Sequence, residues 1–500
     1  MSNLLDKASI ILTPTAYNNG EALCVKPSDG SGDFDFSRNS AATRVNAQGL
    51  VENVQILSSN LVVNGDFATD SDWSMQASWS IANGKASYSG AGNGHYIKQN
   101  ASLTIGSQYI AKLDILDNSG NFRISVDGGT ASYNNYTTGN GTYSFTFVAS
   151  SSEFFVRASM GFSSDTLSID NISVIEITTD TNLPRINYEG GCGSWLFEPQ
   201  TTQLLTYSED FSQSVWLKIG NTTIESGYLA PDGTNSAYKV SGTNGSMFDV
   251  ASMSTTTTRS IYAKTVSGTG QAHLLSYSDN TNNLFTITED WQRFEVNSAI
   301  VNGAENFYAI DFRSGTTLTE ILLWGANATN DQDYATSYIP TSGSTVTRNQ
   351  DVCTGGGSAA LISSTEGTLY AEIAALDKDF TNRYITISDG TTNNRVVLRF
   401  NLSNQVSGFV TSGTAQAVFS HSINILDTNK VAIKYKENDF ALWVNGVEVG
   451  TDLSGNTPIG LDRLGFRNAA NDNPFFGKTK AVAVWKEALS DTELAELTTI

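Results

Sequence analysis

Cysteine and proline are scarce in this sequence, and each scarcity excludes a class of protein. The chain of 500 residues has three cysteines and eight prolines. Cys24, Cys192 and Cys353 are odd in number and far apart, so neither a disulfide framework nor a zinc cluster fits them. We expect three reduced, partly buried thiols. Eight prolines are too few for a rigid proline-rich stalk.

Long apolar runs, a secretory signal and an excess of basic residues are also missing. No apolar run approaches about 18 residues, which argues against a membrane-spanning helix. The first residues show no basic segment followed by an apolar core. With 29 Lys and Arg against 50 Asp and Glu, the net charge of −21 argues against nucleic-acid binding and disfavours an anionic membrane surface. The acidity suits a soluble particle-surface protein and supplies carboxylates for Ca²⁺, although solubility alone also explains it.

Gly, Ser, Thr and Asn are abundant, and they separate short segments in which apolar residues alternate. Tyr143, Phe145 and Phe147 share one face of such a segment. We therefore predict an all-β protein made of tandem jelly-roll or β-sandwich domains. One short C-terminal helix is predicted, because Ser490 followed by Glu493 forms a capping box.

Repeated phrases divide the chain into modules. Asn64-Gly65-Asp66-Phe67 is followed by Trp73, and Ser208-Glu209-Asp210-Phe211 is followed by Trp216, so both tryptophans are predicted core residues. The predicted parts are an inserted jelly roll at 60–177, a second jelly roll at 204–348, a Gly/Ser-rich linker at 349–365, a third module at 366–500, and a discontinuous base made of 1–59 and 178–203.

Motifs for catalysis are missing from all of these parts. There is no Gly-x-Ser-x-Gly sequence, and Gly477-Lys478-Thr479 lacks the upstream glycine of a phosphate-binding loop. His95, His273 and His421 fall in different modules, which argues against a histidine-based triad. A pair of carboxylates for glycoside hydrolysis stays open, because any sandwich could place two at a suitable distance. We predict no catalytic residue and no enzymatic activity.

Residues 60–177 resemble the carbohydrate-binding jelly rolls of the galactose-binding-like superfold. The resemblance rests on the opening phrase at 64–67 and on the closing segment Ile169-Asp170-Asn171-Ile172. It implies a structural Ca²⁺ held by Asn64, Asp66 and Asp170, and this ion is the only cofactor that we expect. Capping of turns by Asn and Asp side chains explains the same residues without an ion.

Sugar binding requires flat aromatic faces flanked by amides and carboxylates. The candidate glycan-binding residues of the first module are Trp79, Tyr96, Tyr133, Asn134, Asn135 and Tyr136. The segment Tyr133-Asn134-Asn135-Tyr136 lies in a polar loop and is the better candidate.

The third module and several scattered phrases carry two further resemblances. Residues 366–499 resemble concanavalin A-like, laminin-G-type lectin domains, on the Trp443-Val-Asn-Gly446 hairpin and the ending that follows Trp485. Arg38-Asn-Ser40-Ala-Ala-Thr43-Arg44 and Phe197-Glu198-Pro199-Gln200 look like phrases of tailed-phage virion proteins of the head-fibre and tail-fibre kind.

These resemblances imply a structural virion protein, with a head fibre favoured over a tail fibre. It would adsorb weakly and multivalently to host-surface glycans, after assembly in the host cytoplasm into a homo-oligomer, with a trimer favoured. We expect other capsid or tail proteins as partners, no nucleic acid and no membrane, and attachment of the base through Arg38, Arg44, Trp195 and Glu198. A secreted glycan-active enzyme with accessory binding modules, or a purely architectural capsid or tail component, remains an alternative.

Overall fold

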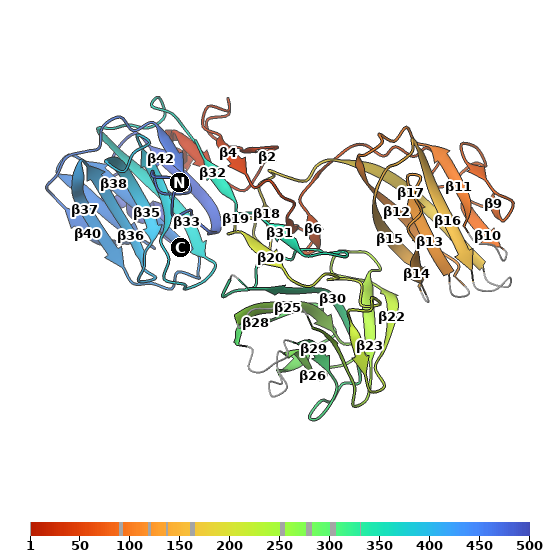
Figure 1. Ribbon diagram of the computed structural model, residues 1–500. Coiled ribbons are helices and arrows are strands. Elements are labelled where there is room, and N and C mark those ends of the chain that lie inside the picture. Colours follow the sequence, from red (N-terminus) through yellow and green to blue (C-terminus); the bar gives the residue numbers. More distant parts are fainter. Residues whose placement is uncertain are drawn as a thin grey trace. The chain divides into compact units, whose positions relative to one another are not determined.

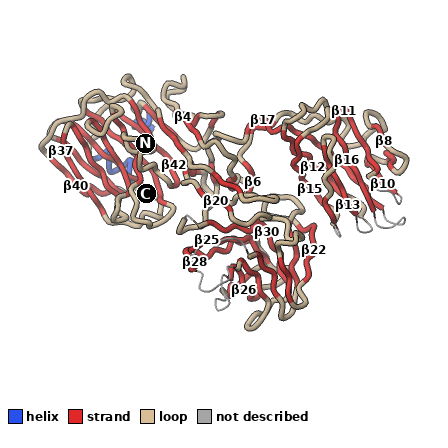
Figure 2. The backbone as a smooth tube through the Cα atoms, in the orientation of Figure 1, coloured by secondary structure: helices blue, strands red, loops and turns tan. Residues whose placement is uncertain are grey.

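The computed structural model describes residues 2–89, 94–118, 122–136, 139–160, 166–250, 256–276, 283–300, 307–330 and 332–500. Strands joined by loops and turns dominate this part of the chain, as Figure 2 shows, which confirms the all-β prediction. Contacts between residues divide the chain into two compact units. Unit 1 comprises Met1–Val54, Thr181–Thr201 and Thr347–Ile500, and unit 2 comprises Gln55–Asp180 and Thr202–Val346.

The first β-sandwich of unit 2 spans residues 56–179 (Figure 1). One sheet has the order β15 (Gly141–Val148), β12 (Gln108–Ile115), β17 (Thr166–Thr179), β10 (Lys85–Ser89) and β9 (Trp79–Ala82), and β7 (Ile56–Leu57) also pairs with β17. The other has the order β14 (Asn134–Tyr136), β13 (Phe122–Asp127), β16 (Glu153–Met160), β11 (His95–Asn100) and β8 (Ser74–Met75). Tyr143 and Phe145 are buried on one face of β15, as the alternation predicts.

The two ends of this first sandwich lie side by side. The Ser58 backbone N–H donates to the Glu176 carbonyl at 3.0 Å, and the Leu61 N–H donates to the Val174 carbonyl at 2.8 Å. The first and last residues of the sandwich are therefore neighbours in space, as an inserted module requires.

The second β-sandwich of unit 2 spans residues 217–329. One sheet has the order β21 (Leu217–Ile219), β24 (Ser246–Asp249), β29 (Tyr308–Asp311), β26 (Gly270–Ser276) and β27 (Leu284–Ile287). The other has the order β22 (Thr223–Tyr228), β23 (Ala237–Ser241), β30 (Glu320–Thr329), β25 (Thr256–Lys264) and β28 (Gln292–Ile300). Because unit 1 resumes at Thr347, this sandwich is a second insertion, which the sequence did not indicate.

Trp73 and Trp216 hold the repeated phrases onto the cores of the two sandwiches, and both are buried as predicted. Trp73 Nε1 donates to the Asn64 carbonyl at 2.9 Å, and Trp216 Nε1 donates to the Tyr207 carbonyl at 2.9 Å. Each indole ring also packs against the phenylalanine of its own phrase, with centroids 5.4 and 4.9 Å apart. The repeated phrase is therefore a structural device that closes each sandwich.

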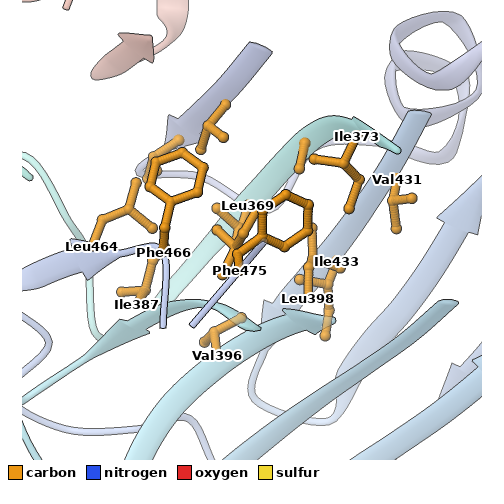
Figure 3. Packing of buried hydrophobic residues seen from close by; sticks show 14 of the residues in the cluster. Leu369, Ile373, Ile387, Val396, Leu398, Val431, Ile433, Leu464, Phe466 and Phe475 are labelled. Atoms are coloured by element: carbon orange, nitrogen blue, oxygen red, sulfur yellow. The ribbon is translucent and has the colours of Figure 1, made fainter. Parts of the chain in front are cut away.

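Unit 1 contains the third β-sandwich, whose core is shown in Figure 3. One sheet has the order β18 (Ile186–Asn187), β19 (Ser194–Phe197), β42 (Gly477–Trp485), β33 (Glu366–Ala375), β38 (Asn429–Lys436), β39 (Asp439–Val444) and β40 (Val447–Asp452), and β1 (Ile10–Leu12) also pairs with β42. The other has the order β37 (Thr414–His421), β36 (Val406–Ser412), β35 (Asn394–Phe400), β34 (Arg383–Ser388) and β41 (Arg463–Gly465). Leu369 and Ile433 of the first sheet pack in one core with Leu398 and Ile387 of the second.

Segments predicted as a base and a linker belong to this same unit. Ile10 pairs with Val484 and Trp195 pairs with Thr479, so both base segments extend the sheet of the C-terminal sandwich. A small sheet has the order β2 (Tyr17–Asn18), β3 (Glu21–Ala22), β4 (Phe34–Ser37) and β32 (Val352–Thr354), so part of the predicted linker is a strand. The remaining strands are β5 (Thr43–Val45), β6 (Val51–Asn53), β20 (Thr201–Gln203) and β31 (Val346–Arg348).

Local motifs near the C-terminus agree with their predictions. Asn445 and Gly446 both have positive φ, 49° and 83°, as a type I′ hairpin between β39 and β40 requires. Helix α2 (Asp491–Thr498) begins with the predicted capping box of Ser490 and Glu493. Helix α1 (Ser2–Lys7) was not predicted, because six residues carry no helical pattern of their own and tertiary contacts stabilise the turn.

Two further expectations concern membranes and thiols. Within the described residues, no helix is both long and apolar enough to cross a membrane. Cys353 is buried and Cys24 is half-buried, but Cys192 is exposed. The prediction of partly buried thiols therefore fails only for Cys192. Burial also raises the pKa of the Cys24 thiol to about 12.

Candidate functional site

One face of the five-stranded sheet in the first sandwich carries aromatic and charged side chains together. Tyr96 on β11 lies opposite Arg157 on β16, and Arg157 lies opposite Ser125 on β13. Two residues further along the same pair of strands, Lys98 lies opposite Phe155. Because successive side chains point to opposite faces of a strand, these residues share the face that is turned away from the core.

The aromatic rings of this face are arranged around one guanidinium group. The rings of Tyr96 and Phe155 meet edge to face at 5.4 Å between centroids. The Arg157 guanidinium carbon lies 4.2 Å from the Phe155 centroid and 5.5 Å from the Tyr96 centroid. Tyr96 is only half-buried, so its ring offers a flat apolar surface beside hydrogen-bonding groups, as sugar recognition requires.

Buried polar groups hold Arg157 in place. Arg157 Nε donates to Asp127 Oδ2 at 3.0 Å, and Ser125 Oγ donates to the same oxygen at 2.7 Å. Asp127 is almost fully buried while Arg157 is half-buried. Arg157 Nη2 also donates to Asp127 Oδ1 at 3.4 Å, so the carboxylate fixes the position of the guanidinium group.

The predicted glycan-binding residues lie in different places. Tyr96 belongs to this face, and the half-buried Tyr133 contacts it through Arg123, whose guanidinium carbon lies 5.0 Å from the Tyr133 ring centroid. Asn134 is exposed on β14. The side chains of Asn135 and Tyr136 lie outside the described residues.

Trp79 is corrected from a binding residue to a core residue. It is 4% exposed and packs on Tyr88 with 5.2 Å between centroids. Its Nε1 donates to the His95 carbonyl at 3.1 Å, so the indole is held within the sandwich. Sequence alone could not distinguish this tryptophan from an exposed one, because a strand residue one position away would face the opposite side.

The opening and closing phrases that suggested a calcium site do lie together. The Ile172 N–H donates to the Gly65 carbonyl at 2.8 Å. The Asn64 side chain, however, bonds within its own turn, since Nδ2 donates to the carbonyls of Thr69 and Ser71 at 2.9 Å each. Asn64 therefore fits turn capping better than metal ligation.

Asp66 and Asp170 are the two carboxylates among the three predicted calcium ligands. Burial raises the pKa of Asp170, and the charges of Asp114 and Asp66 add to the rise. Among the described residues, no group of three or more His, Cys, Asp or Glu side chains is arranged to hold a metal ion. Calcium binding by Asp66 and Asp170 stays a prediction.

Three of the four residues predicted to attach the base lie inside unit 1. Arg38, Trp195 and Glu198 are at most 2% exposed. In this fold they do not reach another protein directly, which corrects the prediction of direct contact for them. Arg44 is half-buried, and its Nε donates to Glu52 Oε1 at 2.8 Å. The sequence suggested a surface because charged residues are rarely buried unless they are paired.

The buried charges form what we call the arginine network, which consists of Arg38, Arg185, Arg348, Glu198 and Asp351. Asp351 accepts hydrogen bonds from Arg38 Nη1 at 3.1 Å and from Arg185 Nη2. Glu198 pairs with Arg185 and, at 2.7 Å, with Arg348 Nη1. These residues come from all three chain segments of unit 1, so the network ties the segments together at the points where unit 2 is inserted.

A carboxyl group with a raised pKa lies in the segment before the second sandwich. Tyr338 Oη donates to Glu209 Oε1 at 2.8 Å, and Ser208 Oγ lies 2.6 Å from Tyr338 Oη. Burial raises the pKa of Glu209 to about 7, the charge of Asp232 adds to the rise, and the Tyr338 hydrogen bond opposes it. Glu209 is half-buried and belongs to no polar surface that we identify, so its expected effect is on stability.

We expect Glu209→Gln to change how stability depends on pH. Because the pKa is higher in the folded chain, the folded state binds more protons than the unfolded state between about pH 4.5 and 7. Stability from this group is therefore complete below that window and is lost as the pH rises through it. The variant should be roughly 1–2 kcal/mol more stable than the native chain at pH 8, and similar to it at pH 4.5. Urea unfolding at both pH values measures this, and equal stabilities at pH 8 would contradict it.

Neither a protein-family model nor a curated protein sequence matches this chain. Solved structures do match parts of it. The CBM40 module of the Ruminococcus gnavus IT-sialidase, bound to α2,3-sialyllactose, is 18% identical over 29% of this chain and 94% of that chain, with a TM-score of 0.26. Domain 4 of the arabinanase AbnA from Geobacillus stearothermophilus, in complex with arabinotriose, is 13% identical over 34% and 84%, with a TM-score of 0.23.

The tandem CBM22 domains of Xyn10C from Paenibacillus barcinonensis are 11% identical over 52% of this chain and 94% of that chain, with a TM-score of 0.20. CBM40 and CBM22 are carbohydrate-binding modules with β-sandwich folds. At TM-scores this low, the likenesses carry no argument about what this chain binds. The candidate site therefore stands on its own geometry.

Sequence reasoning found Tyr96 but missed the rest of its face. Phe155, Arg157 and Asp127 lie on strands that are adjacent in space and distant in sequence. The sequence does indicate that β16 has a polar side, since Glu153 and Arg157 are separated by buried residues along this strand. The pairing of β16 with β11 and β13, which brings these side chains together, is not written in any one segment.

Proposed function

We propose that this chain is a glycan-binding structural protein of a tailed-phage virion, most simply a head fibre or another surface decoration. The observation that carries glycan binding is the half-buried Tyr96 ring beside the guanidinium of Arg157, which Asp127 holds, on the face of a β-sandwich. Such a face stacks on the C–H side of a sugar while the guanidinium group donates to its hydroxyls. The virion assignment rests on the phrases around Arg38 and Glu198, which look like those of head-fibre and tail-fibre proteins.

Weak single-site contacts fit an oligomeric particle component. One sugar contact of this size binds near millimolar, or about −4 kcal/mol. A homo-oligomer, with a trimer favoured, would present several copies and raise the avidity without new contacts. In this proposal the protein assembles in the host cytoplasm, contacts other capsid or tail proteins through unit 1, and catalyses no reaction.

Replacing Tyr96 tests the site. We expect Tyr96→Ala to weaken glycan binding by the whole oligomer roughly tenfold, because it removes the stacking surface. Tyr96→Phe keeps the ring and should retain most of the affinity, and Tyr228→Ala in the second sandwich should change nothing. A glycan array with the four proteins measures this.

The opposite results also have a clear meaning. Unchanged binding by Tyr96→Ala would remove this face as the site. No binding by the native oligomer, together with normal adsorption of phage that lacks the protein, would leave a purely architectural role as the function.

A further inference from the structure

A polar cavity in unit 1 lies at the edge of the five-stranded sheet of the C-terminal sandwich. Its volume is about 320 Å³, which falls within the range of pockets for small ligands. The residues lining it that carry the argument are Asp35, Thr386, Ser388, Arg463, Arg467 and Asn468. They come from β4, β34, β41 and the segment after β41, so the cavity is built from distant parts of one unit.

Two groups in the cavity lack an internal partner. Thr386 is 2% exposed, and its Oγ1 makes no hydrogen bond among the described residues. Arg467 is half-buried, and within the described part of the chain it makes no hydrogen bond or ion pair. A buried hydroxyl without a partner is costly, and so is a partly desolvated guanidinium without an anion. A polar ligand in the cavity would give both groups a partner.

Two other polar residues of the cavity, Arg463 and Asn468, have partners within the protein. Arg463 pairs with its neighbour Asp462, with Nε 2.7 Å from Oδ1. Asn468 accepts from Arg395 Nη1, and its Nδ2 donates to Asp472 Oδ1 at 2.6 Å. These contacts hold the walls of the cavity in place, and Arg467 is left without an ion pair among the described residues.

The cavity continues onto a basic face of the same sheet. Ser388 lies opposite Arg395, and Tyr384 lies opposite Arg399, so these residues share a face with Thr386 and point away from the core of the sandwich. Arg395 and Arg399 stack on Phe409, with guanidinium carbons 4.9 and 5.0 Å from the ring centroid.

No ion pair joins Arg395, Arg399 or Arg467 to a carboxylate among the described residues. This is unusual for a chain whose net charge is −21, because acidic groups are plentiful. Burial lowers the pKa of Arg395 and repulsion by Arg399 adds to this, whereas the charges of Tyr384 and Asp472 oppose it. A nearby anion would relieve this repulsion.

We propose that the cavity and the adjoining basic face form a second binding site, which takes a sugar carrying a carboxylate or a phosphate group. The negative group is held by Arg467, while Arg395 and Arg399 supply a positive field at the entrance. The exposed Asp35 at the other side accepts from ring hydroxyls, and Thr386 completes the floor. The inference shares with the proposed function only that the ligand is a sugar, since it concerns another unit and other residues.

Three matched hexoses test the site in the whole chain: glucose, glucuronate and glucose 6-phosphate. We expect both anionic sugars to bind with a Kd near about 1 mM by calorimetry, and glucose to bind at least tenfold more weakly. Added salt should weaken the anionic sugars selectively. Tighter binding of the phosphate than of the carboxylate, or the reverse, identifies which anionic group the site prefers, and either result supports the proposal.

Variants separate this site from the sandwich face of unit 2. Arg467→Gln removes no hydrogen bond or ion pair among the described residues and should weaken glucuronate roughly tenfold or more. Lys436→Gln removes an equal charge from the other sheet, together with an ion pair to Glu366, and should not change glucuronate binding. Thr386→Val deletes only the unpartnered hydroxyl and should weaken all sugars while the fold is kept. Tyr96→Ala should leave glucuronate binding unchanged.

Three results would overturn the inference. They are equal binding of glucose and glucuronate, unchanged affinity in Arg467→Gln, and no binding of either anionic sugar up to about 50 mM. Each leaves the proposed function untouched, because glycan binding through Tyr96 is measured separately on the array.

Discussion

Replacing Asp351 with asparagine should destabilise unit 1 by about 3–5 kcal/mol. Asp351 is buried, and it is the carboxylate that holds both Arg38 and Arg185. Asp351→Asn keeps the shape of the side chain but leaves three buried guanidinium groups facing a single carboxylate, that of Glu198. An uncompensated charge in an interior is among the most destabilising changes that one substitution makes. Urea unfolding with hydrogen exchange on the strands of unit 1 measures the loss.

Two controls show whether charge balance is the cause. Asp462→Asn breaks the exposed ion pair with Arg463 in the same unit and should cost less than about 1 kcal/mol. The double variant Arg38→Gln/Asp351→Asn removes one charge of each sign and should be more stable than Asp351→Asn alone. A loss below about 1 kcal/mol for Asp351→Asn would show that the network does not hold the segments together.

Substituting alanine for Gly65 should cost the first sandwich about 3 kcal/mol or more. A Cβ at Gly65 would lie 2.0 Å from the Ile172 carbonyl oxygen, which is backbone and cannot turn aside. The turn at Gly65 also cannot move away from β17 cheaply, because the Ile172 N–H donates to the Gly65 carbonyl at 2.8 Å. The expected result is a lower midpoint for the unfolding of this sandwich, measured by thermal scans.

Gly84 in the same sandwich provides the matched control. Its φ of +70° is left-handed, but a Cβ there would meet nothing within 4 Å. Gly84→Ala should therefore cost only about 1 kcal/mol, from backbone strain alone. Equal effects of the two substitutions would mean that close approach of the opening and closing phrases is not what requires glycine at position 65.

Features carried by neighbouring residues were predictable from the sequence. The Asn445-Gly446 hairpin, the Ser490 capping box and the burial of Trp216 each depend on a few adjacent positions, and the structure has all of them. Their physical causes are local: a backbone that needs positive φ, an orphan helix N–H, and a large apolar ring beside a turn.

Features that depend on which strands pair were not predictable. The sequence does not indicate that Arg38 and Arg185 are buried, because their carboxylate partner Asp351 lies far along the chain. Phe155 and Arg467 were missed for the same reason: the neighbours that give each its role belong to other strands. Alternation indicates which side of a strand is polar, but it does not indicate what lies across from it.

The pairing of β1 with β42 sets an order in time for the making of this protein. Residues 10–12 leave the ribosome early, yet their partner strand at 477–485 emerges only after both sandwiches of unit 2 have been synthesised. At a usual rate of translation this delay is roughly 25–100 seconds, far longer than a small β-sandwich needs to fold. We therefore expect the two insertions to fold first. The N-terminal strand β1 of unit 1 stays without its partner until β42 has been synthesised.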